Sequence, residues 1–132
     1  MKKNVVIIDD HEIVRMGLKR LLSEHKRYNV LFDIESPKHI PRDLSDVVDI
    51  VILDLSFSVG LCDLSCIDYV KTKFPNTNII VFSMMDEEIF GLDVIKYGVK
   101  GFVSKETSGE YLIEALNKVC DGGVYLSNKL SA

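Results

Sequence analysis

Four short apolar runs, each followed directly by a polar residue, constrain the fold of this chain more than any other feature of its sequence. The runs are Val5–Ile8, Ile50–Leu53, Ile79–Phe82 and Gly101–Val103. The first three are continuously apolar, which is typical of strands covered on both faces of a parallel sheet. The stretches between them place apolar residues at helical spacing, as Leu18, Leu21 and Leu22 do. The pattern therefore predicts strands that alternate with helices.

The expected elements follow this alternation along the whole chain. We expect strands at Asn4–Ile8, Val30–Ile34, Ile50–Leu53, Asn78–Phe82 and Gly101–Ser104. We expect helices at His11–His25, from Asp63 or Ser65 to before Pro75, from after Met85 to Gly98, and from Thr107 or Ser108 to before Gly122. Pro37 and Pro41 make any helix within residues 36–46 short or irregular. Five such units predict a flavodoxin-like, doubly wound α/β fold of the (βα)5 type, with a parallel sheet in strand order 2-1-3-4-5.

Composition excludes several classes of protein. The 132 residues suit one domain with a buried core. A net charge of −4 argues against this segment binding nucleic acid by itself. We find neither an apolar run long enough to cross a bilayer nor a signal segment, so we expect a cytoplasmic protein. Three cysteines without the spacing of a disulfide framework or a zinc site are interpreted as reduced thiols.

The polar residues at the strand ends point to a single site. They are Asp9, Asp10, Asp54, Ser83 and Lys105. In a parallel sheet the strand C-termini lie along one edge, where ligands bind, so these side chains should converge there. Carboxylates in such proximity repel one another unless a cation joins them, and an all-oxygen site suits Mg²⁺. A carboxylate can also act as a nucleophile toward phosphorus, so the set indicates phosphoryl transfer onto an Asp.

Three segments carry a resemblance to a known family. They are Val6-Ile7-Ile8-Asp9-Asp10-His11-Glu12-Ile13-Val14-Arg15-Met16-Gly17-Leu18, Gly98-Val99-Lys100-Gly101-Phe102-Val103-Ser104-Lys105 and Gly123-Val124-Tyr125-Leu126-Ser127. In this order and spacing, the chain resembles the receiver domain of two-component response regulators of the LuxR/NarL type. The match spans nearly all of the chain.

The resemblance implies a metal site and a phosphoacceptor. Asp54 would accept the phosphoryl group. Asp10 would bind Mg²⁺ (or Mn²⁺) directly, Asp9 directly or through water, and Asp54 and the backbone carbonyl of Ser56 would complete the protein ligands. In such a domain the chemistry is limited to its own phosphorylation and dephosphorylation, so we do not expect a general enzyme.

The resemblance also implies which residues would respond to phosphorylation. Lys105 would hold a phosphoryl oxygen, and Ser83 would reorient to hydrogen-bond another. Phe102 occupies the position of the family's switch aromatic residue, which is Tyr in many receivers. Phe lacks the hydroxyl that a Tyr would use for a hydrogen bond.

Partners and domain limits follow from the same resemblance. We expect a receiver domain at residues 1–123, and at 124–132 the start of a linker to a C-terminal helix-turn-helix that binds DNA. A free-standing receiver is the alternative. A histidine kinase would donate the phosphoryl group. A homodimer would use either the first and last helices, or the face formed by the helix after Met85, the strand Gly101–Ser104 and the last helix. Tyr97, Lys100 and Tyr111 are candidates for the second face.

Some positions depart from the family pattern and keep alternatives open. Residues 57–63 lack the usual Pro and carry about one extra residue, and Met84 is bulky beside Ser83. One alternative is therefore a pseudo-receiver that acts by protein contacts without phosphorylation. A second is a phosphatase of the haloacid-dehalogenase type, although Ser56 stands where that family has its acid. A third is a flavin- or nucleotide-binding protein, although Asp9 and Asp10 would repel phosphate.

Overall fold

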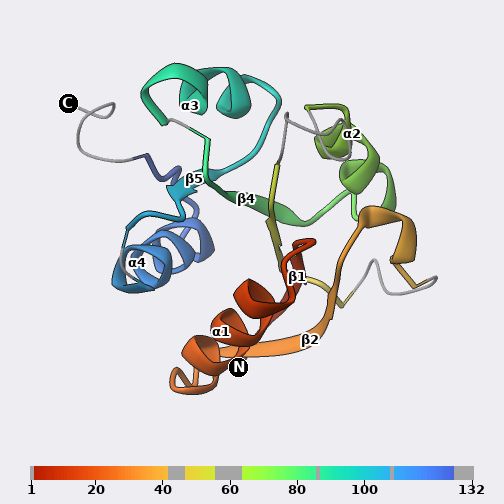
Figure 1. The fold of residues 1–132 in the computed structure, drawn as a ribbon, viewed down its shortest axis with the longest axis vertical. Helices are drawn as coiled ribbons and strands as arrows, with labels where there is room; N and C mark the ends of the chain where they lie inside the picture. Colours follow the sequence, from red (N-terminus) through yellow and green to blue (C-terminus); the bar gives the residue numbers. More distant parts are fainter. Residues whose placement is uncertain (1, 42–46, 56–63, 86, 108, 127–132) are drawn as a thin grey trace.

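The sheet has the predicted strand order. The computed structural model describes residues 2–41, 47–55, 64–85, 87–107 and 109–126. Its strands are β1 (Lys3–Ile8), β2 (Tyr28–Ile34), β3 (Ile50–Leu53), β4 (Asn78–Ser83) and β5 (Gly101–Ser104). They form one parallel sheet in the order β2-β1-β3-β4-β5 (Figure 1). The flavodoxin-like prediction is confirmed.

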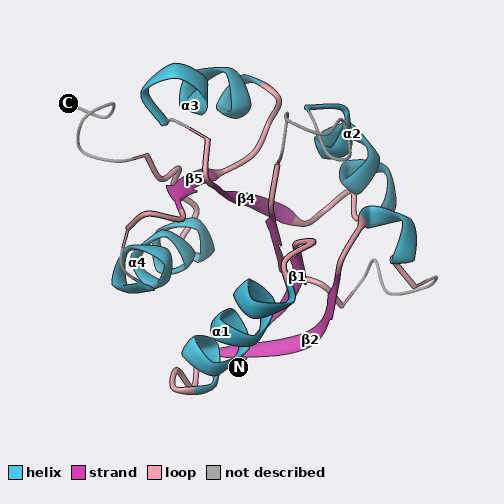
Figure 2. Cartoon of the chain, in the orientation of Figure 1, coloured by secondary structure: helices cyan, strands magenta, loops and turns pink. Residues whose placement is uncertain are grey.

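Helices cover both faces of this sheet. They are α1 (Glu12–Ser23), α2 (Leu64–Lys73), α3 (Glu87–Lys96) and α4 (Gly109–Cys120), with a short 3₁₀ helix, η1 (Pro37–His39), in the crossover after β2 (Figure 2). α1 and α4 lie on one side of the sheet, and α2 and α3 lie on the other (Figure 1). The architecture is therefore doubly wound. No helix among the described residues is long and apolar enough to span a membrane.

Alternation along each strand divides the core into two layers. In β1, Val5 and Ile7 join the cluster that contains Leu22 of α1 and Leu116 of α4. Their neighbours Val6 and Ile8 join the second cluster, which contains residues of α2 and α3. The central strands are buried on both faces, which explains why their sequences are continuously apolar.

The start of β2 and the end of α3 differ from the prediction, and the short helix expected after β2 is found. β2 begins at Tyr28 rather than Val30, because the buried Tyr28 side chain donates a hydrogen bond to Asn117 of α4 and its backbone pairs with Lys3. The expected short helix after β2 is the three-residue η1. α3 ends at Lys96 instead of Gly98, because Gly98 adopts a φ of 95°. The contacts of Tyr28 join segments far apart in sequence, so local patterns do not reveal them.

The chain after α4 returns to the sheet. Tyr125 donates its N–H to the carbonyl of Lys100 at 2.8 Å and accepts the N–H of Phe102 at 3.1 Å. Its side chain is buried in the α1–α4 layer. The edge of β5 is thereby partly covered, which limits pairing with other chains. The domain boundary at residue 123 stays a prediction.

A glycine turn after α3 depends on a lysine from α2. Lys71 donates from Nζ to the carbonyl of Tyr97 at 2.6 Å, which satisfies a carbonyl near the end of α3. A Cβ on the next residue, Gly98, would lie 1.9 Å from Lys71 Nζ. Any side chain at Gly98 would therefore occupy a left-handed conformation and displace the lysine.

We expect Gly98→Ala to lower the free energy of unfolding by about 1–2 kcal/mol. The matched control is Gly17→Ala in the exposed face of α1, where no atom lies within 4 Å of the added Cβ. That change should raise stability by about 0.5–1 kcal/mol, because Ala restricts the unfolded chain. Urea unfolding measures both. Equal effects of the two substitutions would contradict the conformational role of Gly98.

Candidate functional site

The ends of four neighbouring strands bring the predicted polar residues together. Asp9 follows β1, Asp54 follows β3, Ser83 ends β4, and Lys105 follows β5. Backbone hydrogen bonds continue past the strands and hold these ends in register. Asp54 N–H donates to the carbonyl of Ile8 at 2.9 Å, and Lys105 N–H donates to that of Ser83 at 2.9 Å. Sheet pairing thus sets the spacing of the site.

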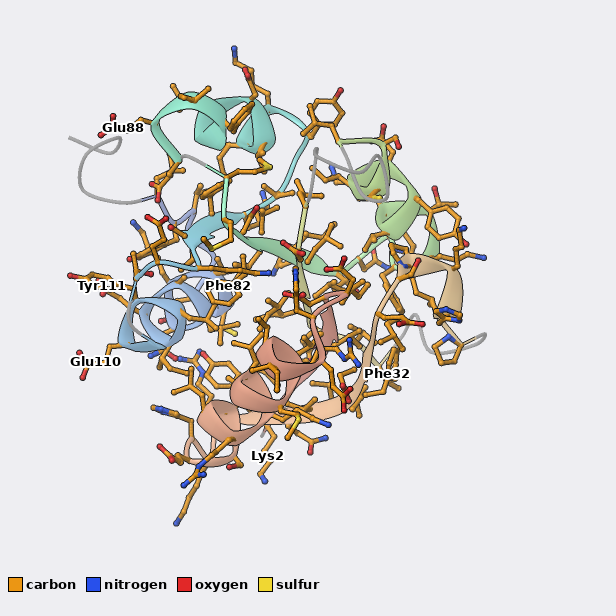
Figure 3. All side chains as sticks on the ribbon, viewed as in Figure 1. Lys2, Phe32, Phe82, Glu88, Glu110 and Tyr111 are labelled. Atoms are coloured by element: carbon orange, nitrogen blue, oxygen red, sulfur yellow. The ribbon has the colours of Figure 1, made fainter. Side chains whose placement is uncertain are left out.

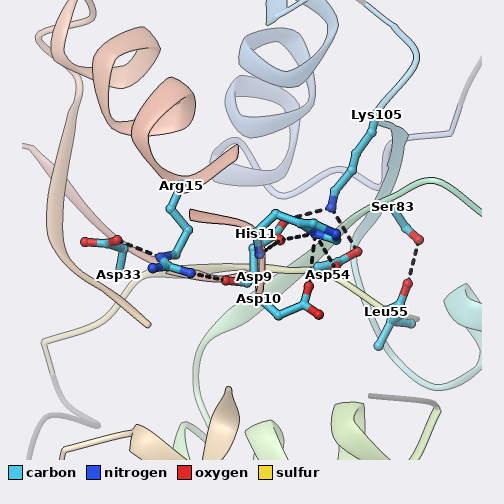
Figure 4. A network of polar contacts seen from close by, with 9 residues as sticks. All are labelled: Asp9, Asp10, His11, Arg15, Asp33, Asp54, Leu55, Ser83 and Lys105. Atoms are coloured by element: carbon cyan, nitrogen blue, oxygen red, sulfur yellow. Dashed lines mark hydrogen bonds and ion pairs between the residues drawn. The ribbon is translucent and has the colours of Figure 1, made fainter. Parts of the chain in front are cut away.

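Lys105 bridges the two buried carboxylates. Its Nζ lies 2.8 Å from Asp9 Oδ2 and 3.2 Å from Asp54 Oδ1 (Figure 4). The side chains of Lys105 and Asp54 are each 8% exposed, and that of Asp9 is 2% exposed. A buried carboxylate without a cation is costly, so Lys105 supplies the charge that allows both aspartates to stay beneath the surface.

Burial raises the pKa of Asp54 to about 6, and the negative charge of Asp9 adds to this effect, while Lys105 opposes it. The carboxyl group is therefore still largely ionised at neutral pH, but its charge is poorly solvated. A carboxylate of this kind gains from a further cation nearby.

The acidic pocket has the donor set of a divalent cation site. Ligand atoms of Asp9, Asp10, His11 and Asp54 all lie within 4.8 Å of one another. Asp9 Oδ2 is buried and accepts no hydrogen bond, its charge partner being Lys105. Carboxylate oxygens suit Mg²⁺, so the residues present fit such an ion. Ser56, predicted to give a backbone carbonyl, lies outside the described residues, as does the segment 57–63.

His11 also belongs to this pocket, although it was not among the predicted site residues. Its Nδ1 lies 3.0 Å from Asp9 Oδ1, 3.0 Å from Asp10 Oδ1 and 4.0 Å from Asp54 Oδ2. Its backbone N–H donates to Asp9 Oδ1 at 2.8 Å. The signal that could have identified His11 is its position two residues after Asp9, where an Asp side chain commonly accepts a backbone N–H.

Ser83 does not face the carboxylates in this state. Its hydroxyl is fully buried and donates to the carbonyl of Leu55 at 2.8 Å (Figure 4). The same oxygen accepts the N–H of Met85 at 3.1 Å. The hydroxyl therefore joins the residue after Asp54 to the turn before α3. Met84, between them, is exposed.

Phe102 is fully buried in the same core layer as Val94 of α3 and Val99. The predicted switch position is thus in its inward orientation. Other residues of the α3–β5–α4 face are exposed. Figure 3 shows Glu110 and Tyr111 projecting outward from α4, and Tyr97 is also exposed.

Arg15 of α1 connects the site to the edge of the sheet. It donates to the Asp9 carbonyl at 2.6 Å and to Asp33 Oδ2 at 2.9 Å (Figure 4). Lys19 lies 3.1 Å from the other oxygen of Asp33. Burial raises the pKa of Asp33, but hydrogen bonds from Lys19 and Arg15 outweigh it and leave this pKa below its usual value. The backbone at Asp9 is therefore fastened to both α1 and β2.

Known proteins are similar to this chain in sequence and in fold. A family model described as the response regulator receiver domain matches residues 5–117. The chain is 32% identical to the oxygen regulatory protein NreC of Staphylococcus epidermidis over 128 residues, covering 96% of this chain and 59% of NreC. It is 29% identical to the transcriptional regulatory protein DegU of Brevibacillus brevis over 131 residues, covering 98% of this chain and 55% of DegU. The chain thus spans little more than half of these curated relatives.

Solved structures of response regulators have the same fold as this chain. The isolated REC domain of RcsB from Salmonella enterica serovar Typhimurium, with the phosphomimetic BeF₃⁻, superposes with a TM-score of 0.85 at 27% identity, covering 99% of this chain and 97% of that one. An RcsB–DNA complex superposes with a TM-score of 0.86 at 27% identity, covering 99% of this chain and 66% of RcsB.

The raised pKa of Asp54 should make the free energy of unfolding depend on pH. Since the pKa is about 6 in the folded protein and about 3.9 in the unfolded chain, the favourable contribution is present below pH 4 and is lost as the pH rises through 6. We expect Asp54→Asn to increase the free energy of unfolding at pH 7.5 by about 1–3 kcal/mol, with the gain disappearing near pH 4. Urea titrations across this pH range measure it.

The matched control is Asp93→Asn on the exposed face of α3. It should change stability by less than about 0.5 kcal/mol at either pH. A destabilised Asp54→Asn protein at pH 7.5 would contradict the electrostatic account of the site.

Arg15 and Lys19 both contact Asp33, and their contributions to stability can be compared. We expect Arg15→Met to lower the free energy of unfolding by about 1–3 kcal/mol, because two charge-assisted hydrogen bonds are lost from partly buried partners. Lys19→Met should cost less than about 1 kcal/mol, because Lys19 is more exposed. Urea unfolding measures both, and equal losses would show that Arg15 contributes no more than a surface ion pair.

Proposed function

Because this chain belongs to the response regulator receiver domain family, and its relatives are regulators of the LuxR/NarL type, we propose that it accepts a phosphoryl group on Asp54 and transmits that event to an output. One observation carries the proposal: Lys105 bridges Asp54 and Asp9 at the carboxyl edge of the sheet. This is the arrangement of nucleophile and cation that phosphoryl transfer requires.

The reaction uses one oxygen of Asp54 as the nucleophile. This oxygen forms a bond to phosphorus while the bond from phosphorus to the donor breaks, and the donor leaves with the electron pair. The donor is the phosphorylated histidine of a histidine kinase, and its imidazole, freed of the phosphoryl group, is the leaving group. Lys105 Nζ, already 3.2 Å from Asp54 Oδ1, would stabilise charge on the phosphoryl oxygens.

Mg²⁺ is the proposed cofactor, with Mn²⁺ as a substitute. Asp9, Asp10 and Asp54 would hold the ion, together with the backbone carbonyl of Ser56. When bound, the ion neutralises charge on the carboxylates and on the phosphoryl oxygens. The raised pKa of Asp54 and the close spacing of the carboxylates support this assignment.

Ser83 and Phe102 are the proposed switch. On phosphorylation, Ser83 would release the carbonyl of Leu55 and hydrogen-bond a phosphoryl oxygen. That change alters the turn before α3, since Met85 N–H donates to the same hydroxyl. Phe102 lies beneath α3, so a shift of this turn can reach the α3–β5–α4 face through core packing.

The output proposed for the whole protein is DNA binding through a helix-turn-helix domain that follows a linker beginning at residue 124. DegU is named a transcriptional regulatory protein, and RcsB has been solved with DNA, which supports this proposal. Dimerisation is proposed through α1 and α4 or through α3, β5 and α4. Both faces expose apolar residues, among them Met16 on the first and Leu92 on the second. The cytoplasmic location stays a prediction.

Intact mass after incubation with acetyl phosphate and MgCl₂ tests the phosphoacceptor directly. Here acetate is the leaving group. We expect one phosphoryl adduct on the wild-type chain and none on Asp54→Asn, because that change removes the nucleophile. Chelation of the metal should abolish the adduct. Asp68→Asn on α2 is the matched control and should be phosphorylated normally.

Absence of an adduct on folded, metal-loaded wild-type protein would refute the proposal and favour the pseudo-receiver. Repeated turnover of a phosphate ester would instead support the phosphatase alternative. The receiver family match argues against both the phosphatase and the flavin- or nucleotide-binding protein.

A further inference from the structure

We propose that His11 is an additional ligand of the cation site through Nδ1, and that the pocket therefore prefers divalent transition ions such as Mn²⁺ and Co²⁺ over Mg²⁺. This inference rests on the proposed function, because it concerns the same metal site. The distances around His11, rather than the acidic cluster alone, support it.

The spacing of the donor atoms matches a coordination sphere. An octahedral ion with bonds of about 2.1 Å places neighbouring ligands about 3.0 Å apart and opposite ligands about 4.2 Å apart. His11 Nδ1 lies 3.0 Å from Asp9 Oδ1 and 3.0 Å from Asp10 Oδ1, and 4.0 Å from Asp54 Oδ2. The imidazole nitrogen is thus close to two carboxylates and farther from the third (Figure 4).

Two features position the backbone of His11 and the carboxylate next to it. The backbone of His11 is held by its N–H donating to Asp9 Oδ1 and by its place at the start of α1. Asp9 itself is buried, and its Oδ2 lies 2.8 Å from Lys105 Nζ, which fixes the orientation of the carboxylate. Asp9 Oδ1, which accepts the His11 N–H, is the oxygen that lies beside Nδ1.

The nitrogen donor changes the selectivity of the site. Oxygen-only sites suit Mg²⁺, whereas imidazole raises affinity for transition ions, in the order Mn²⁺, Co²⁺, Ni²⁺. In the ligated state the proton of the ring is on Nε2, which leaves Nδ1 free to coordinate. The competing interpretation is that His11 is a counter-charge that any divalent ion displaces, and it predicts the opposite effect of removing the ring.

Calorimetric titration of the 132-residue chain with MgCl₂, MnCl₂ and CoCl₂ tests the proposal, with His11→Ala as the variant. We expect His11→Ala to weaken Co²⁺ binding by about tenfold or more, as loss of a well-placed metal partner does. Mg²⁺ binding should change by less than about threefold. The visible absorption of bound Co²⁺ should also change. His39→Ala, which removes an exposed histidine paired with Glu35, is the control and should change neither.

His11 is 61% exposed, so its removal should leave the fold intact, which circular dichroism verifies. Unchanged Co²⁺ affinity and spectrum in His11→Ala would overturn the proposal, as would tighter binding of all three ions. Failure of the wild-type chain to bind any of the ions would refute the metal site of the proposed function itself. That outcome is distinct from metal binding that does not depend on His11.

Discussion

The contact of Lys105 with Asp9 and Asp54 is the interaction on which the rest of the site depends. Two carboxylates with almost no exposed surface cannot remain charged side by side without a cation. Lys105 reaches them because β5 is paired to β4, and β4 to β3, in a fixed parallel register. The pairing of the sheet therefore holds Asp54, the proposed nucleophile, next to the Lys105 ammonium, and the helices cover the sheet.

The ammonium only partly compensates this charge. The pKa of Asp54 remains about 6 because burial and Asp9 outweigh Lys105. The pocket thus has negative charge in excess, which suits the proposed binding of a divalent ion. The same excess makes the apo site less stable than a neutral one, so function and stability oppose each other at Asp54.

Much of this arrangement could be predicted from local patterns. Apolar runs ending in Asp, Ser or Lys indicated both the strands and the edge where Asp9, Asp54 and Lys105 meet, because parallel strands end on the same side. Side-chain orientation could not be predicted in the same way. The position of His11 depends on the turn made by the Asp9 carboxylate, and the hydrogen bond of Ser83 depends on Leu55, 28 residues away. The early start of β2 likewise depends on the remote Asn117.

The short turn between β1 and α1 supplies most of the residues of the acidic pocket. It carries Asp9, Asp10 and His11 in succession, and its backbone is fastened by Arg15, one turn into the helix. Arg15 in turn depends on Asp33 at the sheet edge. Ile13 and Met16, which are exposed on the same helix, lie within two residues of Arg15. The backbone of Asp9 is therefore joined to α1 and to β2 through one guanidinium group.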